Sequence, residues 1–162
     1  MQEIEPSPAI RIVSYQPEYR QAFFDLNHWW IEKYFEMEAK DYETLRHPET
    51  YILEPGGAIL VALSGERPVG VCALLAADGD AGVYELAKMG VDPGFQGRGV
   101  GRSLGAAVLE RARQMGATKV FLESNRTLTP ALQLYRKLGF REVSGIPSPY
   151  RRSDIRMEVD LS

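Results

Sequence analysis

Three glycines alternate with other residues in one short segment, Gln96-Gly97-Arg98-Gly99-Val100-Gly101-Arg102. Glycine lets the main chain turn sharply and leaves its N–H groups uncovered by a side chain. An apolar stretch precedes the segment and an amphipathic one follows it, so we expect the glycines to lie between a strand and the N-terminus of a helix. Such an N-terminus favours an anion, and Arg98 and Arg102 add positive charge. The segment predicts a phosphate site; the alternative is a turn that only permits tight strand–helix packing.

The two common nucleotide motifs do not match this segment. A P-loop needs Gly-Lys-Ser/Thr at the end of its glycine run, and no such triplet is present. A dinucleotide fingerprint needs Gly-x-Gly-x-x-Gly after the first strand of a parallel unit. Here the spacing from Gly97 to Gly101 is Gly-x-Gly-x-Gly, and the preceding strand belongs to a predicted antiparallel meander. The phosphate ligand is therefore of another kind.

Hydrophobic periodicity and breaker residues place this loop within a series of strands and helices. We expect strands at 9–15, 58–63, 69–77, 83–91, 118–123, 140–143 and 155–161, and helices at 17–35, 40–46, 99–115 and 129–138, the last with Thr129 as N-cap and Pro130 at the first helical position. Short connections make the strands over 58–91 antiparallel neighbours. The order predicts an α+β fold with helices on both faces of the sheet. No repeat or long linker divides residues 1–162, so we expect one domain.

The composition excludes several classes of protein. Of the 162 residues, 44% are hydrophobic and 25% are charged, which is typical of a globular domain and not of a disordered chain. A net charge of −3 gives no basic excess for binding nucleic acid. One cysteine and two distant histidines provide neither an internal disulfide nor a metal motif. The acidic start is unlike a signal peptide and no apolar run could span a membrane, so we expect a cytoplasmic protein with no membrane partner.

The run from Gln96 to Gly101 matches the Gln/Arg-x-x-Gly-x-Gly/Ala signature of the GNAT superfamily of acetyl-CoA-dependent N-acetyltransferases. The chain resembles this family over most of its length, most strongly over 85–143. The resemblance implies a three-layer α/β/α sandwich with a mixed, mostly antiparallel sheet, and acetyl-CoA as co-substrate with no metal. It implies that the loop amides hold the pyrophosphate of coenzyme A and that the backbone of Met89 and Val91 pairs with the pantetheine arm like an added strand. The implied cofactor-binding residues are Met89, Val91, Gln96, Gly97, Arg98, Gly99, Val100, Gly101, Arg102 and Asn125.

Three of the family's positions have alternative interpretations here. By resemblance to the histone-acetylating branch, Glu85 is the general base, acting directly or through water; the alternative is a glutamate that points to solvent beside Lys88. Tyr135 stands where the family's tyrosine protonates the leaving thiolate, and the alternative is core packing on one face of its helix. Asn125 resembles the asparagine that hydrogen-bonds the cofactor arm, and the alternative is a turn residue before the next helix.

We therefore expect an N-acetyltransferase that moves the acetyl group of acetyl-CoA to a primary amine of a small molecule or peptide by direct attack. The alternative is a non-catalytic acyl-CoA-binding regulatory module, which needs neither Glu85 nor Tyr135. Cys72 is not expected to carry the acetyl group, because no histidine partner is recognisable near it. Residues 150–152 (Tyr-Arg-Arg) either border the acceptor groove or form a plain surface loop. The sequence leaves open which amine is acetylated and whether the protein is a homodimer.

Overall fold

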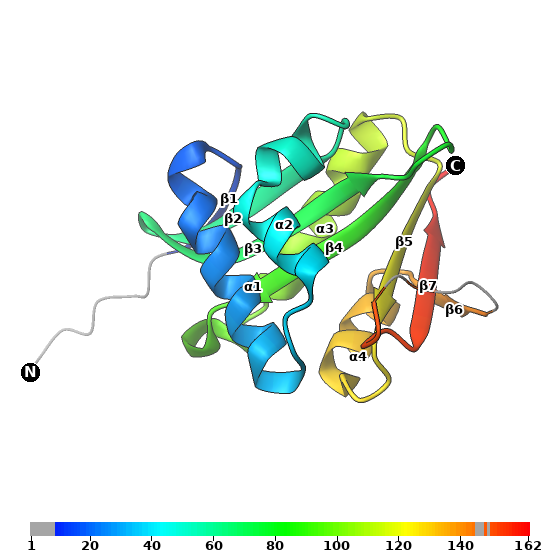
Figure 1. Ribbon diagram of the computed structural model, residues 1–162. Helices are drawn as coiled ribbons and strands as arrows, with labels where there is room; N and C mark the ends of the chain where they lie inside the picture. Colours follow the sequence, from blue (N-terminus) through cyan, green and yellow to red (C-terminus); the bar gives the residue numbers. More distant parts are fainter. Residues whose placement is uncertain (1–8, 145–147, 149) are drawn as a thin grey trace, which may run out of the picture.

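The computed structural model of the chain describes residues 9–144, 148 and 150–162. Within these residues seven strands form one sheet in the order β1-β2-β3-β4-β5-β7-β6 (Figure 1). The strands are β1 (Ile10–Ser14), β2 (Ala58–Ser64), β3 (Arg67–Ala76), β4 (Val83–Val91), β5 (Lys119–Ser124), β6 (Arg141–Val143) and β7 (Ile155–Asp160). Neighbouring strands are antiparallel except β4 and β5, which are parallel. The predicted mixed, mostly antiparallel sheet is confirmed.

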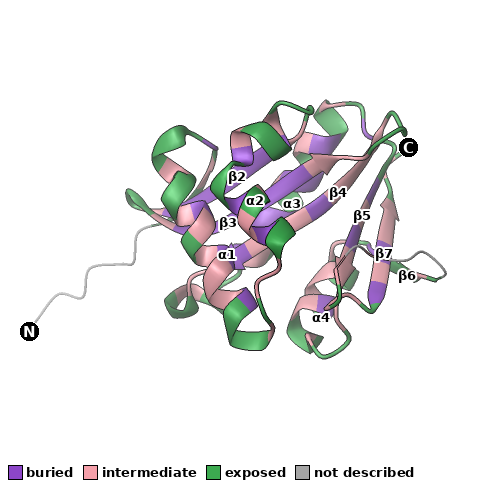
Figure 2. Cartoon of the chain, in the orientation of Figure 1, coloured by how far each residue is buried: buried purple, intermediate pink, exposed green. Residues whose placement is uncertain are grey.

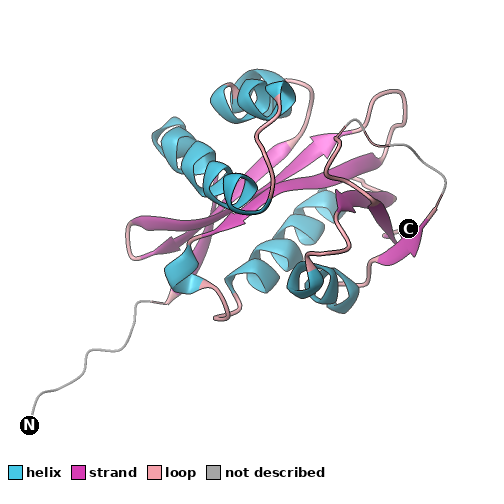
Figure 3. Ribbon diagram, turned by 60° about the horizontal axis from the view of Figure 1, so that its bottom comes forward, coloured by secondary structure: helices cyan, strands magenta, loops and turns pink. Residues whose placement is uncertain are grey.

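Helices cover both faces of the sheet, which confirms the three-layer α/β/α arrangement (Figure 3). Helices α1 (Arg20–Tyr34) and α2 (Ala39–Arg46) lie on one face, and α3 (Val100–Gln114) and α4 (Thr129–Lys137) lie on the other. Short helical segments occur at η1 (Pro17–Tyr19), η2 (Glu49–Leu53) and η3 (Pro93–Phe95). None of the helices in the described part of the chain is long and apolar enough to cross a membrane.

The central strands are buried on both faces (Figure 2). Successive side chains of a strand point to opposite faces, so β2 and β3 supply two separate cores. On the α1 side, Phe23 and Ile31 pack in one core with Val61. On the α3 side, Leu104 and Val108 belong to the other core. Burial of each such side chain contributes roughly 1.5–3 kcal/mol, so these cores hold both helical layers on the sheet.

Two local predictions differ from the structure. Thr129 is not an N-cap, because α4 begins at Thr129 itself, after Leu128, and no side chain caps it. The turn before α4 is instead organised by Asn125, whose Oδ1 accepts hydrogen bonds from the backbone N–H and the hydroxyl of Thr127 at 2.9 and 2.6 Å. The segment η2 was not predicted; its Ile52 is fully buried in the core that also contains Phe23 and Ile31 of α1.

Strands β4 and β5 diverge after a short parallel pairing, and this divergence creates the site. Their ladder covers only Val83–Glu85 of β4, and Glu85 pairs with Phe121 at its end (Figure 1). Close to the divergence the register of β3 with β4 shifts, and Lys88 has the positive φ of 54° that accompanies this bulge. Beyond the bulge, Gly90 approaches α1 so closely that a Cβ would lie 2.7 Å from the carbonyl oxygen of Leu26. The second half of β4 therefore borders a gap on its β5 side.

Candidate active site

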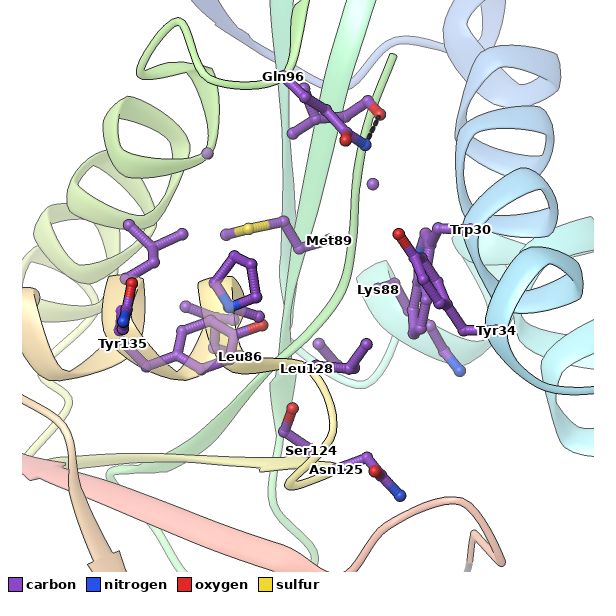
Figure 4. A pocket seen from close by; sticks show the side chains of 18 of the residues that line it. Trp30, Tyr34, Leu86, Lys88, Met89, Gln96, Ser124, Asn125, Leu128 and Tyr135 are labelled. Atoms are coloured by element: carbon purple, nitrogen blue, oxygen red, sulfur yellow. Dashed lines mark hydrogen bonds between the residues drawn. The ribbon is translucent and has the colours of Figure 1, made fainter. Parts of the chain in front are cut away.

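A cleft of about 690 Å³ fills the gap between the diverging strands, a volume within the usual range for small-molecule sites. One wall consists of the loop over 95–102 and the start of α4. The other wall consists of the end of α1 together with Tyr150, Arg152 and Ser153. Figure 4 shows Tyr135 on one side of β4 and Trp30, Tyr34 and Lys88 on the other, with Met89 between them. The cleft thus has a side formed by α3 and α4 and a side formed by α1 and the loop before β7.

The glycine loop has the predicted position, between β4 and the N-terminus of α3. Gly97 and Gly99 have φ values of 76° and 80°, which side-chain-bearing residues rarely adopt, and Gly99 is the N-cap residue of α3. Gly101 has a different reason to be glycine: a Cβ there would lie 3.3 Å from Leu134 Cδ2 on α4. The first turn of α3 therefore presents its free N–H groups next to the cleft, where phosphate oxygens are favoured.

The predicted cofactor residues line the cleft with one exception. Those that line it are Met89, Val91, Gln96, Gly97, Gly99, Val100, Gly101, Arg102 and Asn125. Arg98 is not among the lining residues; its guanidinium lies over the ring of Phe95, 5.1 Å from the centroid. Gln96 donates from Nε2 to the carbonyl oxygen of Val91 at 3.3 Å, which ties the loop to the end of β4. The cationic contribution next to the loop therefore comes from Arg102.

Asn125 lines the cleft and also connects two loops. Its Nδ2 donates to the carbonyl oxygen of Arg152 at 2.6 Å, while Oδ1 accepts from Thr127. Both ends of the amide thus have protein partners, as the turn interpretation predicts. Contact between Asn125 and the cofactor stays a prediction.

Glu85 is mostly buried at the floor of the cleft, and its pKa is raised from 4.5 to about 7. Burial is the main cause, and the negative charge of Glu123 on β5 adds to it. The positive charges of Lys88 and Arg156 act in the opposite direction. Glu123, which also lines the cleft, was not predicted from the sequence; it accepts a hydrogen bond from the hydroxyl of Ser148 at 2.6 Å. Glu85 therefore does not point to bulk solvent, and it changes charge near neutral pH.

Tyr135 projects from α4 into the other side of the cleft. Its ring packs edge-on against Phe140 with centroids 6.1 Å apart, so the residue also takes part in the core. Burial raises the pKa of its hydroxyl above the ordinary value, and the neighbouring Cys72 acts in the same direction. The phenol is thus protonated over the whole physiological range, as a proton donor must be.

A buried ionic network forms the α1 side of the cleft and was not predicted from the sequence. Asp41 on α2 is fully buried and accepts from Lys88 Nζ at 2.9 Å. It also accepts hydrogen bonds from both terminal nitrogens of Arg152, at 2.7 and 2.8 Å. The backbone N–H of Glu38 donates to the same carboxylate at 2.8 Å, and Arg152 reaches the Glu38 carboxylate at 3.2 Å. The ammonium of Lys88 further donates to the hydroxyl of Tyr150 at 3.0 Å.

The pKa of Asp41 reflects this network. Burial raises it, but the hydrogen bonds from Arg152, the charge of Lys88 and the Glu38 N–H outweigh burial and lower it to about 2. The sequence contained one signal for the network: a lysine within the apolar stretch of β4. Its partners, on α2 and in the loop before β7, could not be found from local patterns. Of residues 150–152, Tyr150 and Arg152 border the cleft, whereas Arg151 is an exposed residue that does not line it.

The remaining candidates for chemistry are the thiol of Cys72 and groups of metal-binding side chains. Cys72 is fully buried, and burial raises the pKa of its thiol far above the ordinary value. Among the described residues, no group of three or more His, Cys, Asp or Glu side chains could hold a metal ion.

The model of the acetyltransferase (GNAT) family matches residues 23–140. The chain therefore belongs to the GNAT family of acetyltransferases. Two solved structures show the same fold. An acetyltransferase of the GNAT family from Staphylococcus aureus has a TM-score of 0.85 at 21% identity, covering 95% of this chain and 100% of that one. A Salmonella typhimurium protein solved with its cofactor acetyl-CoA has a TM-score of 0.78 at 19% identity, covering 95% of each chain.

Curated relatives match over shorter stretches. The N-alpha-acetyltransferase RimI of Mycobacterium tuberculosis is 44% identical over 69 residues, which is 43% of this chain and 41% of that protein. The N-acetylaspartate synthetase of Rattus norvegicus is 37% identical over 93 residues, which is 57% of this chain and 31% of that protein. The chain thus spans about a third of the length of the synthetases that it matches.

Proposed function

We propose that the protein transfers the acetyl group of acetyl-CoA to a primary amine of a small molecule or peptide by direct attack. The observation that carries this proposal is that the glycine loop, Glu85 and Tyr135 all border one cleft at the divergence of β4 and β5. A binding module has no need for a near-neutral carboxylate and a protonated phenol in one cleft. Cys72, buried and with a raised thiol pKa, offers no accessible thiolate to carry an acetyl group.

The cofactor residues provide binding and orientation. Acetyl-CoA supplies an acetyl group activated as a thioester. Arg102 and the N–H groups at the start of α3 would hold its phosphates, because free helix donors and positive charge favour anions. The second half of β4, including Met89 and Val91, pairs with β3 but lies beyond the ladder with β5, and on that side it would hold the pantetheine arm through its main chain. Orientation of this kind removes much of the entropic barrier to the reaction.

Glu85 would act as the general base and Tyr135 as the general acid. An amine is mostly protonated at neutral pH, so a base must take its proton before attack. A carboxylate with a pKa of about 7 is a far better base than an ordinary glutamate, and Glu85 would act directly or through water. Tyr135 would donate its proton to the sulfur as the thiolate leaves. Its raised pKa does not prevent this, because burial raises the pKa of a thiolate leaving into the same apolar surroundings.

The names of the relatives support an amine acceptor. One is an N-alpha-acetyltransferase and the other an N-acetylaspartate synthetase, so each name describes acetylation of an amine nitrogen. The matched stretches cover 43% and 57% of this chain, so the acceptor of this protein is a proposal.

The test is an assay of free thiol released from acetyl-CoA with a panel of amines: amino acids, amino acid amides, short peptides, polyamines and lysine side chains. We expect thiol release that depends on the amine, together with a mass increase of one acetyl group on that amine. Thiol release at the same rate without any amine, or none with any member of the panel, would contradict transfer to an amine.

A further inference from the structure

The carboxylate of Asp41 is saturated by its partners. Each of its two oxygens accepts two hydrogen bonds, one from Arg152 and one from either Lys88 or the Glu38 backbone. A carboxylate has about four lone-pair positions, so Asp41 cannot accept more. Any further donor on Lys88 or Arg152 must find its acceptor elsewhere.

Several N–H and O–H donors of Lys88, Tyr150 and Arg152 have no acceptor among the described residues. Lys88 has three N–H bonds, and within the described residues two of them have acceptors, Asp41 and Tyr150. Tyr150 accepts from Lys88, and its own hydroxyl hydrogen has no acceptor among the residues that the structure describes. Arg152 uses both N–H bonds of Nη1 and one of Nη2, which leaves the second Nη2 bond and Nε without an acceptor in the described part of the chain. All three residues line the cleft.

The charges of the cluster lie on different sides of it. Lys88 and Arg152, whose side chains are 5% and 13% exposed, carry two positive charges, and the carboxylates of Asp41 and Glu38 balance them. Lys88 and Arg152 line the cleft, whereas Asp41 and Glu38 are not among its lining residues. The free donors therefore face the cleft together with positive charge, and both favour an anionic ligand group.

We propose that the acceptor is an amino acid, a small amine with a free carboxylate beside its amino group, and that Lys88, Tyr150 and Arg152 bind that carboxylate. The inference rests on the proposed function, because it assigns the acceptor side of the same cleft. The acidic side chains of Glu85 and Glu123 also line the cleft, where they attract the amino group. Opposite charges at the two places orient an amino acid with its nitrogen towards the base.

Other acceptors fit the cluster less well. A polyamine would place a second ammonium against the positively charged side of the cluster that lines the cleft. A peptide N-terminus has a neutral amide where an amino acid has its carboxylate, so it would offer the free donors no charged acceptor. The guanidinium of Arg152 also lies over the ring of Tyr150, 4.5 Å from its centroid, and 6.0 Å from that of Trp30, which holds its planar face in one orientation.

The first experiment compares matched acceptors with the unaltered protein. Glycine, alanine, aspartate and phenylalanine are each assayed against their α-amides, with free thiol release at constant pH and corrected for amine pKa. We expect kcat/KM to be at least tenfold higher for the preferred amino acid than for its amide, with most of the difference in KM. Equal values, or preference for the amide, would overturn the carboxylate site while leaving amine acetylation intact. Failure of every amine would overturn the proposed function and this inference with it.

The second experiment uses variants. Tyr150→Phe removes one donor and keeps the ring, and we expect KM for the amino acid to rise about tenfold while KM for the amide stays constant. Tyr51→Phe, an exposed tyrosine on η2 remote from the cleft, is the matched control and should change neither value. Arg152→Gln should abolish the preference for amino acid over amide. Should Arg152→Gln not fold, Tyr150→Phe decides; a rise in KM that is equal for both acceptors would overturn the proposal.

Discussion

Glu85 and Lys88 lie three residues apart on β4, and each changes what the other can do. The positive charge of Lys88 lowers the pKa of Glu85, whereas burial and Glu123 raise it, and the balance lies at about 7. Without Glu123 the carboxylate would be a weaker base, and without Lys88 it would be neutral over more of the physiological range. The pKa of the proposed base is therefore determined by burial and by charged side chains from three strands, Lys88 on β4, Glu123 on β5 and Arg156 on β7.

Glu85→Gln tests the base. In the unaltered protein kcat/KM should fall as pH decreases through about 7, because Glu85 becomes protonated. The variant should lack this decrease at pH 7 and should be about 10²-fold less active at pH 7.5, with the difference shrinking towards pH 10 as the amine loses its proton in solution. Steady-state kinetics from pH 5.5 to 10 measure both effects. An unchanged profile in the variant would assign the base to another group.

The same substitution gives a readout of stability. A carboxylate whose pKa is raised on folding destabilises the folded state once pH exceeds its ordinary pKa, and the cost is complete above about 7. Glu85→Gln should therefore leave stability nearly unchanged at pH 4 and increase it by about 3 kcal/mol at pH 9. Urea unfolding at the two pH values measures this. An equal change in the free energy of unfolding at both pH values would mean that Glu85 is not desolvated.

Tyr135→Phe tests the acid. The variant keeps the ring that packs against Phe140, so its melting temperature should change little. If the hydroxyl protonates the thiolate, kcat should fall by about 10²-fold or more while the affinity for acetyl-CoA stays constant, because the interaction develops only as sulfur gains charge. Kinetics and calorimetry separate the two quantities. Full activity would leave water as the acid and Tyr135 as a core residue.

At the scale of elements, local sequence patterns located nearly every helix and strand. The glycine loop could be placed because its neighbours, an apolar strand and an amphipathic helix, are both strong signals. The Asp41–Lys88–Arg152 network could not be predicted in this way. Lys88 and Arg152 lie 47 and 111 residues after Asp41 in the chain, and the three meet only through the fold. Patterns within one element cannot show which polar residue of α2 will be opposite the bulge of β4.

Gly99→Glu tests the loop as an element that binds phosphate. A side chain at position 99 would meet open space, but the backbone there has a φ of 80°. The substitution therefore combines backbone strain with a negative charge at the N-terminus of α3. Gly79→Glu is a matched control: Gly79 has a φ of 77°, open space and no place in the cleft. Both variants should be destabilised alike. Only Gly99→Glu should bind acetyl-CoA at least about tenfold more weakly, which corresponds to a loss of roughly 1.4 kcal/mol of binding free energy. Calorimetry that finds equal affinities would remove the loop from the phosphate site.

At the scale of the whole molecule, one buried carboxylate joins three distant parts of the chain around the acceptor side of the cleft. Asp41 on α2 holds the bulge of β4 through Lys88 and the loop before β7 through Arg152. The two cores fix each helical layer on the sheet, but neither core includes a described residue of that loop. That residues 1–162 form one domain stays a prediction, and the network is the feature by which the described parts would act together.

Acid unfolding tests this connection. Because the pKa of Asp41 is lowered to about 2, its contribution to stability is complete above the ordinary value of 3.8 and is lost as pH falls from there towards 2. The contribution is about 2 kcal/mol. Asp41→Asn should unfold more easily at pH 7, since it leaves Lys88 and Arg152 without a charged partner, and its stability should depend less on pH between 4 and 2.

Glu49 provides the comparison for that measurement. Its pKa is also lowered to about 2, where hydrogen bonds from Arg20 and Tyr15 outweigh burial, but its side chain is 32% exposed and lies outside the cleft. Glu49→Gln should therefore weaken the pH dependence less, since water and salt screen an exposed pair. Only Asp41→Asn should also raise KM for the acceptor while leaving the affinity for acetyl-CoA unchanged. A pH profile of Asp41→Asn parallel to that of the unaltered protein would mean that the network does not hold the acceptor side of the cleft together.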